Sequence, residues 1–294
     1  MPSQANQPLP EGTLLQRYRI QRVLASGGFS FVYLAEDDKG DAVAIKEYLP
    51  STLALRVNGA RRLDVPPEVT PLFHAGMKCF IEEAGAIAHL EHPNVVRVLD
   101  FFRENETVYL VMRYEEGRSL QEHIKARRGA LEELWVRNTF AQLLDGLREV
   151  HARKLLHLDI KPANVYLRRD GSPVLIDFGA ARQVLSADAP KLPTAFTPGF
   201  APPEMRTDRS LLGPWSDVYS VGATMYACFA GVAPPPAETR LVDDVLVPAS
   251  RGLAGKYAPE LLDAVDWCLQ LDHLRRPQSV LALQKVLLGE DRRS

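Results

Sequence analysis

Cysteine is scarce in this sequence. Its 294 residues include only Cys79, Cys228 and Cys268, which lie far apart and form no C-x-x-C pair. A disulfide scaffold or a cysteine-based zinc site needs more cysteines at closer spacing, and no group of histidines and cysteines has the spacing of metal ligands. We therefore expect three reduced thiols and a cytoplasmic protein.

Long apolar runs and an excess of charge of one sign are also missing. The longest apolar stretch, residues 218–233, contains Ser220 and Thr224 and is broken by glycines near its end. A membrane-spanning helix needs about 20 predominantly apolar residues, so a buried core helix is expected there instead. Residues 1–10 are polar and rich in proline, without the apolar core of a signal peptide. The formal net charge of -2 provides no global field for nucleic acid or an anionic membrane, so we expect neither as a partner.

The first third of the chain has the alternating, β-branched pattern of strands. We predict strands at residues 19–24, 31–36, 42–48, 95–102 and 107–114, and one amphipathic helix at 73–90. Residues 49–71 have no clear periodicity and contain several prolines and arginines. They are predicted to form a long insertion.

After Gly117 the pattern changes to the helical period, with apolar residues at i, i+3 and i+4. The predicted helices are 120–127, 134–151, 217–230, 259–271 and 279–288, with short extended segments at 155–167 and 173–177. A small β-rich half followed by a larger helical half predicts an α+β fold with two lobes and a cleft between them.

Four short motifs follow one another along the chain. They are ASGGFSFV at residues 25–32, VAIK at 43–46, HLDIKPAN at 157–164 and DFG at 177–179. A lone DFG means little, but D-x-K-x-x-N followed by DFG thirteen residues after its asparagine is hard to obtain by chance. With these motifs, residues 14–288 resemble the eukaryotic-like protein kinases. IKEYLP at 45–50 and RPQSV at 276–280 resemble a bacterial group of serine/threonine kinases within that family.

The resemblance implies a bilobal protein-kinase fold, with a small β-sheet N-lobe that carries one regulatory helix and a larger, mainly helical C-lobe. The expected division is a flexible tail at residues 1–13, an N-lobe at 14–115 with the insertion at about 49–71, a C-lobe at 116–289 and a tail at 290–294. It also implies that the chain transfers the γ-phosphate of ATP, with Mg²⁺, to serine or threonine hydroxyls of protein substrates, itself included.

Each charged residue of the motifs has an implied role. Lys46 would hold the α and β phosphates and pair with Glu83 of the first helix, for which the neighbouring Glu82 is the alternative. Asp159 would accept the proton of the attacking hydroxyl, and Lys161 would neutralise the transferring group.

The resemblance also implies how the nucleotide and its metal are held. Asn164 and Asp177 would provide the hard oxygen ligands that Mg²⁺ prefers, and Mn²⁺ could substitute for it. Ala25 and Ser30 stand where the family's glycine-rich loop has its outer glycines, which predicts a stiffer or weaker grip on ATP. Ser119 replaces an acidic residue that often holds the ribose. The expected ATP-binding residues are Gly27, Gly28, Val32, Ala44, Lys46, Met112, Arg113, Glu115 and Tyr166.

The segment after DFG matches an activation segment. Thr197, together with Lys161, favours serine/threonine over tyrosine specificity, and Arg276 would form a buried pair with Glu204 at the segment's end. Thr194 is either an autophosphorylation site or an ordinary loop threonine.

Leu158 stands where many kinases have an arginine that binds a phosphorylated activation loop. We therefore hypothesise that loop phosphorylation is not required by that route. The segment would instead be ordered by packing or by its ion pair.

The insertion at 49–71 precedes the helix of Glu83, so we hypothesise that it positions this helix; it could also bind a regulatory partner. The alternative is a tolerated surface loop. Arg56, Arg61 and Arg62 could meet an acidic partner, although three arginines on a loop are usually solvated.

Two other functions stay open. A pseudokinase would bind nucleotide without turnover, which the departures at Ala25, Ser30, Leu158 and Ser119 favour, although the catalytic residues are all present. A small-molecule kinase of the aminoglycoside type would lack the closure between Glu204 and Arg276.

Overall fold

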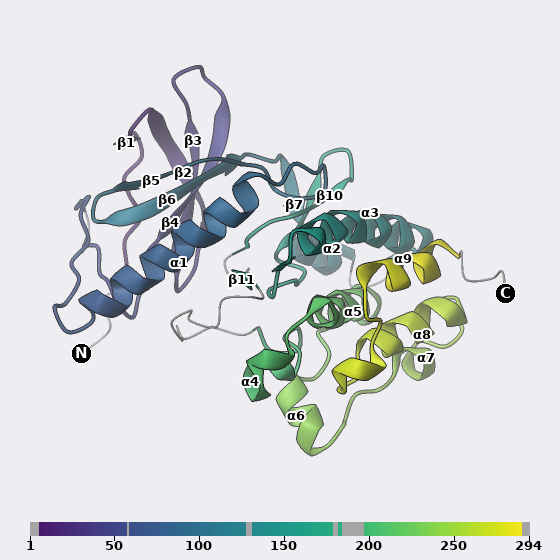
Figure 1. Ribbon diagram of the computed structural model, residues 1–294. Helices are drawn as coiled ribbons and strands as arrows, with labels where there is room; N and C mark the ends of the chain where they lie inside the picture. The colour runs from purple at the N-terminus through teal and green to yellow at the C-terminus, as the bar shows by residue number, and fades with distance from the viewer. Residues whose placement is uncertain (1–5, 58, 128–130, 179–181, 184–196, 290–294) are drawn as a thin grey trace. The chain divides into compact units, whose positions relative to one another are not determined.

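The computed structural model describes residues 6–57, 59–127, 131–178, 182–183 and 197–289 (Figure 1). Their contacts divide the chain into two compact units. Unit 1 comprises the described residues within Met1–Leu90 and Arg97–Glu115, and unit 2 comprises those within Glu91–Val96, Glu116–Ser186 and Thr194–Ser294.

Unit 1 contains a six-stranded antiparallel sheet in the order β1-β2-β3-β4-β6-β5 (Figure 1). Five strands fall where the alternating pattern predicts them. The two-residue β1 was not predicted, because so short a strand is defined by its pairing and leaves no periodicity. The strands are β1 (Leu14–Leu15), β2 (Tyr18–Ser26), β3 (Ser30–Glu36), β4 (Ala42–Tyr48), β5 (Val98–Glu104) and β6 (Thr107–Arg113).

One long helix, α1 (Thr70–Ala88), packs on this sheet. It begins three residues earlier than predicted, because Pro71 suits the first turn of a helix, where its missing N–H is not needed. The ring of Tyr48, the last residue of β4, packs at a tilt against Phe73 and Phe80 of this helix, with ring centroids 5.4 and 5.8 Å apart. Its hydroxyl lies against Gly76, where any side chain would collide with it. The end of β4 and α1 therefore form one packed element.

The N-terminal segment and the insertion both contribute to the hydrophobic core of unit 1. Within the tail expected at residues 1–13, Leu9 is only 2% exposed and belongs to the hydrophobic core of unit 1. Leu49, Ala54 and Leu63 of the insertion belong to the same core. Apolar side chains in segments without periodicity gave no signal of this burial, so residues 6–13 were wrongly assigned to a flexible tail.

The three arginines of the insertion do not share one environment. Arg61 and Arg62 are exposed, as expected of loop arginines. Arg56 is completely buried, with its guanidinium on the carboxylate of Glu47, so the solvated alternative does not hold for this arginine. A charge this deep in a protein needs a paired partner, and that partner lies on β4.

Unit 2 is mainly helical. The five long helices fall at the predicted positions, and they pack in the pairs α3 with α9 and α5 with α8. The helices are α2 (Leu120–Arg127), α3 (Glu133–Ala152), α4 (Glu204–Thr207), α5 (Pro214–Ala230), α6 (Ala237–Val242), α7 (Ala249–Gly252), α8 (Pro259–Cys268) and α9 (Val280–Leu288).

Short strands complete unit 2. β7 (Gly117–Ser119), β9 (Val165–Arg168) and β10 (Pro173–Leu175) form a three-stranded sheet, and β8 (Leu155–Leu156) pairs with β11 (Arg182–Gln183). These strands set the two ends of the segment 157–164, which the sequence singled out for its chemistry.

Helix α5 is the buried centre of unit 2 (Figure 1). Gly222 lets α8 approach closely, because a side chain there would collide with Cys268. The helix ends at Gly231, whose left-handed conformation, with φ of 76°, is the usual C-terminal stop. The apolar stretch at 218–233 is therefore a core helix, as predicted.

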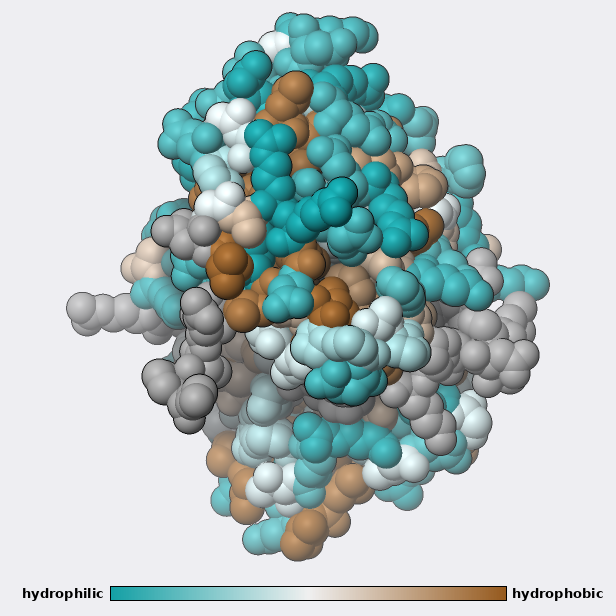
Figure 2. Space-filling model, turned by 90° about the vertical axis from the view of Figure 1, so that its left-hand side faces the viewer, coloured by the Kyte–Doolittle hydropathy of each residue, from teal (hydrophilic) through white to brown (hydrophobic). Residues whose placement is uncertain are grey.

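Hydrophilic side chains make up most of the face shown in Figure 2, and hydrophobic ones form separate patches on it. Among the described residues, no helix combines the length and the apolar character needed to cross a membrane.

Candidate active site

The loop between β8 and β9 brings together three polar residues that the sequence singled out. The ammonium group of Lys161 donates to both carboxylate oxygens of Asp159, at 3.0 and 2.7 Å, and to the hydroxyl oxygen of Thr197, at 2.9 Å. The Thr197 hydroxyl in turn lies 3.4 Å from Asp159. The side chains of Asp159 and Lys161 are 24% and 22% exposed, so the pair remains open to a reactant. A carboxylate, an ammonium and a hydroxyl thus meet at one partly open point.

Asn164 adds to this group a side-chain amide, whose oxygen is of the kind that binds metal ions. Its side-chain nitrogen donates to the main-chain carbonyl and to the carboxylate of Asp159, at 2.9 and 2.8 Å. Both amide hydrogens are therefore used, and the amide oxygen is left for a cation. The carbonyl of Asn164 accepts from Ile176 at 3.0 Å, which ties this loop to the residue before Asp177.

Asp177 and Leu158 have backbone conformations that are rare for residues other than glycine. Their φ angles are 62° and 60°. Such positions cost free energy and persist where the surrounding structure imposes them. With Asn164, Asp177 provides the small set of hard oxygen donors that suits Mg²⁺, which usually keeps waters and substrate phosphates among its ligands. The residues present therefore fit this metal.

A buried carboxylate on α5 fixes the main chain of the loop. Asp217 accepts hydrogen bonds from the N–H groups of His157 and Leu158, at 2.9 and 2.8 Å, and lies 2.8 Å from Nε2 of His151. Burial alone would raise the pKa of Asp217, but the hydrogen bond and charge of His151 and the N–H donors hold that pKa below its usual value. Asp217 therefore stays ionised.

Asp217 was not among the predicted site residues. Only one signal could have found it, which is a carboxylate within the first turn of an otherwise apolar helix. The ring of His157 packs on Phe178 with centroids 4.5 Å apart. Burial lowers the pKa of His157, so this residue is neutral near pH 7 and holds the loop without a charge.

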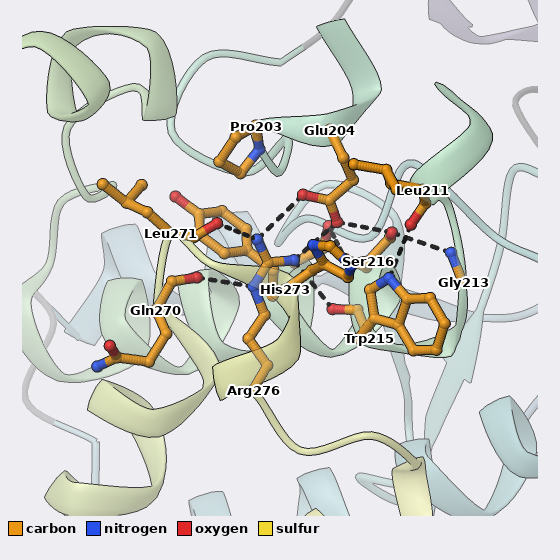
Figure 3. Close-up of polar contacts among 12 residues, drawn as sticks. Pro203, Glu204, Leu211, Gly213, Trp215, Ser216, Gln270, Leu271, His273 and Arg276 are labelled. Atoms are coloured by element: carbon orange, nitrogen blue, oxygen red, sulfur yellow. Dashed lines mark hydrogen bonds and ion pairs between the residues drawn. The ribbon is translucent and has the colours of Figure 1, made fainter. Parts of the chain in front are cut away.

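The ion pair expected at the end of the activation segment is present (Figure 3). Two nitrogens of the Arg276 guanidinium donate to the two carboxylate oxygens of Glu204, at 2.7 and 3.0 Å, and the Ser216 hydroxyl donates to the same carboxylate at 2.7 Å. The remaining donors of Arg276 bond the carbonyls of Gln270, Leu271 and Trp215. This buried fork ties helix α4 to the start of α5 and to the segment before α9.

Leu158 lies in an apolar cluster. It is buried with Leu156 and Met205, and Ala201 and Leu212 pack on them. A leucine therefore joins the catalytic loop to the end of the activation segment by packing, at the position where an arginine would present a charge.

In unit 1, four predicted ATP-binding residues share one face of the sheet. Ala44 and Lys46 are two residues apart on β4, with Met112 of β6 opposite Ala44 and Val32 of β3 opposite Lys46. Directly paired residues on neighbouring strands point to the same side. Lys46 is only 8% exposed, and its ammonium group lies 5.7 Å from the centre of the Phe80 ring of α1.

The other predicted residues of unit 1 are less constrained. Gly27 and Gly28 are exposed in the turn between β2 and β3. The N–H of Arg113 donates to the carbonyl of Arg97, and Glu115 is the last residue of unit 1 before the chain enters unit 2. The side chain of Glu83 lies outside the described residues, although its main chain belongs to α1.

Two predicted residues remain, Tyr166 of the ATP-binding set and Thr194 of the activation segment. Tyr166 is half-buried on β9, where it pairs with Val174 of β10 and Ser119 of β7. Thr194 lies outside the described residues.

Comparison with known proteins agrees with this geometry. Residues 18–288 match the protein kinase domain family, so the chain belongs to that family. It is 33% identical over 239 residues to serine/threonine-protein kinase PknA of Nostoc sp., covering 78% of this chain and 40% of that protein. It is 35% identical over 229 residues to serine/threonine-protein kinase B of Synechocystis sp., covering 74% of this chain and 37% of that protein.

A solved structure gives the same result. The PpkA-294 apo form has a TM-score of 0.84 and 32% sequence identity, and the match covers 95% of this chain and 99% of that one. The predicted fold, a β-sheet N-lobe and a helical C-lobe, is thereby confirmed, as is the resemblance to bacterial eukaryotic-like serine/threonine kinases. The chain spans about two fifths of the length of the two cyanobacterial kinases.

Proposed function

We propose that the protein transfers the γ-phosphoryl group of ATP to serine and threonine hydroxyls of protein substrates, itself included. The observation that carries this proposal is the contact of Lys161 with both Asp159 and Thr197. Phosphoryl transfer needs positioning and charge neutralisation more than covalent help from the protein. A carboxylate beside an ammonium group supplies both.

Each residue of the catalytic loop has a task in this reaction. Asp159 orients the substrate hydroxyl and accepts its proton. Lys161 neutralises charge on the phosphoryl group that is being transferred. Thr197 bonds Lys161 and lies near Asp159, so it holds the end of the activation segment beside these two residues. Asp217 fixes the main chain on which Asp159 is carried.

The nucleotide is held by the remaining predicted residues. Lys46 binds the α and β phosphates, while the face formed by Val32, Ala44 and Met112 receives the adenine. The pairing of Lys46 with Glu83 stays a prediction, because the side chain of Glu83 lies outside the described residues. Asn164 and Asp177 would hold Mg²⁺, for which Mn²⁺ would substitute, and the bound metal would supply positive charge that neutralises the phosphate oxygens. Gly27, Gly28, Arg113, Glu115 and Tyr166 contribute the other nucleotide contacts.

We further propose that the protein acts in the cytoplasm, where ATP is available and its three free thiols stay reduced. A regulatory partner at the insertion, residues 49–71, belongs to the same proposal, since the exposed Arg61 and Arg62 offer positive charge there.

Activity does not require a phosphorylated activation loop that binds a cation at position 158. The apolar cluster of Leu158 and Met205 supports this, because it leaves no cation at that position to bind phosphate. Phosphatase treatment is expected to leave the rate unchanged. A loss that rephosphorylation of Thr194 restores would contradict this part of the proposal.

The proposed function is tested with radiolabelled ATP, the chain itself and a generic basic protein substrate. We expect label on phosphoserine and phosphothreonine and none on phosphotyrosine after acid hydrolysis. Nucleotide binding without transfer would instead identify a pseudokinase. Transfer to small-molecule acceptors alone would identify a metabolite kinase.

A further inference from the structure

Glu47 is a fully buried carboxylate with four hydrogen-bond donors. One oxygen accepts from Arg56 and from the Tyr109 hydroxyl, both at 2.8 Å, and the other accepts from Arg56 at 2.5 Å and from the Tyr33 hydroxyl at 2.8 Å. Burial, followed by the charge of Glu47, raises the pKa of Tyr33 and Tyr109 above the usual value, so both hydroxyls keep their protons and donate them. Because both oxygens of Glu47 accept two hydrogen bonds each, these bonds offset the free-energy cost of burying the ion pair.

Arg56 extends this network to the N-terminal segment, residues 6–9. Its Nε donates to the carbonyl of Gln7 at 2.9 Å, and its main-chain carbonyl accepts from the N–H of Gln7 at 3.1 Å. The side-chain oxygen of Asn6 accepts from the main chain of Arg56, and the N–H of Leu9 donates to the Tyr33 hydroxyl. Residues 6–9 are thus held by a residue of the insertion.

The same hydrogen-bond network is joined through Glu47 to β4, the strand that carries Lys46. Glu47 follows Lys46 directly on β4, and successive side chains of a strand point to opposite faces. Fixing Glu47 from one face therefore fixes the strand that carries Lys46 on the other. The next residue, Tyr48, packs on Phe73 and Phe80 of α1.

The start of the insertion also bonds the glycine-rich turn, which is the turn between β2 and β3 that contains Gly27 and Gly28. The N–H of Leu49 donates to the carbonyl of Phe29 at 2.9 Å, and that of Ser51 donates to the carbonyl of Gly28 at 2.8 Å. The insertion therefore contacts β4 and the turn after β2, and both belong to the parts of unit 1 assigned to the nucleotide.

We propose that Glu47 and Arg56 are positioning residues for ATP, through which the N-terminal segment and the insertion hold the strand of Lys46 and the glycine-rich turn in the binding geometry. The inference rests on the proposed function only for the identity of the ligand. Nucleotide affinity responds to the docking of residues 6–9, although these residues do not contact the nucleotide.

Two substitutions of Arg56 separate positioning from simple stabilisation. Arg56→Met removes the fork and the charge. Arg56→Lys keeps the charge but loses the paired donors and the bond from Nε to Gln7. Deletion of residues 1–8 leaves the pair between Glu47 and Arg56 in place while removing Asn6 and Gln7. Arg61→Met, at an exposed arginine of the same insertion, is the matched control.

The dissociation constant of a non-hydrolysable ATP analogue with Mg²⁺ is measured for each variant by calorimetry, well below its unfolding midpoint. KM for ATP and kcat are measured alongside. We expect Arg56→Met and Arg56→Lys to weaken the affinity about five- to tenfold, and the deletion to weaken it about threefold. KM should rise in parallel, kcat should change less than KM, and Arg61→Met should match the parent.

An unchanged affinity in folded Arg56→Lys and in the deletion variant, with only a lower unfolding midpoint, would overturn the inference and leave the pair a purely structural one. Should Arg56→Met fail to fold, the other two variants decide the question. Because affinity is measured without turnover, a chain that binds the analogue but transfers no phosphate refutes the proposed function and leaves this inference open to the same test.

Discussion

At the scale of single residues, the contact between the activation segment and Lys161 depends on the hydroxyl of Thr197. Thr197 accepts from Lys161 and lies within reach of Asp159, so it links the activation segment to the catalytic loop. Thr197→Val keeps the shape of the side chain and removes this link. We expect kcat to fall roughly tenfold or more, because the loss of a hydrogen bond to a charged group costs about 1.5–3 kcal/mol.

Steady-state kinetics of the Thr197 variants check this expectation. Thr197→Ser restores the hydroxyl and should recover most of the rate with KM for ATP unchanged. Equal activity in the valine and serine variants would show that the hydroxyl takes no part.

Asp217 gives a pH-dependent prediction. Its pKa in the folded protein is below the usual value, so the folded state binds this proton less readily than the unfolded state. The stability that Asp217 contributes is therefore complete above about pH 4, and it is lost as the pH falls from there through the folded pKa. Asp217→Asn should be less stable than the parent at pH 7, with the difference shrinking towards pH 3.

Unfolding midpoints measured from pH 3 to pH 7 test this, with the exposed Asp263→Asn as control. A difference between Asp217→Asn and the parent that stays constant over this range would contradict the assigned ionisation. The same substitution should also lower kcat, because two main-chain donors of the catalytic loop lose their charged acceptor.

Sequence could name the catalytic residues because each stands in a motif with fixed spacing. It could not name Arg56 or Asp217 in the same way. The partner of Arg56 lies nine residues away on a strand, and three loop arginines look alike until the core around one of them has formed. Asp217 lies 59 residues from Leu158, whose N–H it accepts, and no local pattern encodes that distance.

At the scale of elements, the described end of the activation segment, from Thr197, is held by the pair of Glu204 and Arg276. Arg276→Met would leave the buried Glu204 with only the Ser216 hydroxyl as a partner among the bonds described. Breaking a buried pair in this way costs about 3–5 kcal/mol. We expect a clear loss of stability and a lower kcat, because α4 and the segment from Thr197 lose their anchor.

Arg275→Met is the matched control, since Arg275 is exposed next to the same position. Thermal unfolding and kcat are measured for both variants. Equal midpoints would show that the fork of Arg276 contributes nothing to the fold.

Elements were predictable in proportion to their length. α3 and α5 show the helical period over several turns, and their predicted ranges lie within or near the observed ones. β7 and β11 have three and two residues, too few to show a period, and they are strands only because partners lie beside them. The burial of residues in the insertion could not be predicted for a related reason, because it depends on single apolar residues.

At the scale of the whole molecule, the net charge of -2 is small, so the positive groups that act on phosphate must be local. Lys161 beside Asp159 in unit 2 and Lys46 on the sheet of unit 1 meet this requirement. Binding and transfer then depend on different residues, and the two can be separated by substitution.

Asp159→Asn separates them most directly. The amide of this variant still accepts a hydrogen bond but takes no proton. We therefore expect kcat to fall about 10²- to 10⁴-fold. The affinity for a Mg²⁺-bound ATP analogue should stay within about twofold of that of the parent. Asp170→Asn, at an exposed turn, should keep both values. A variant of Asp159 that transfers phosphate at the parent's rate would contradict the account.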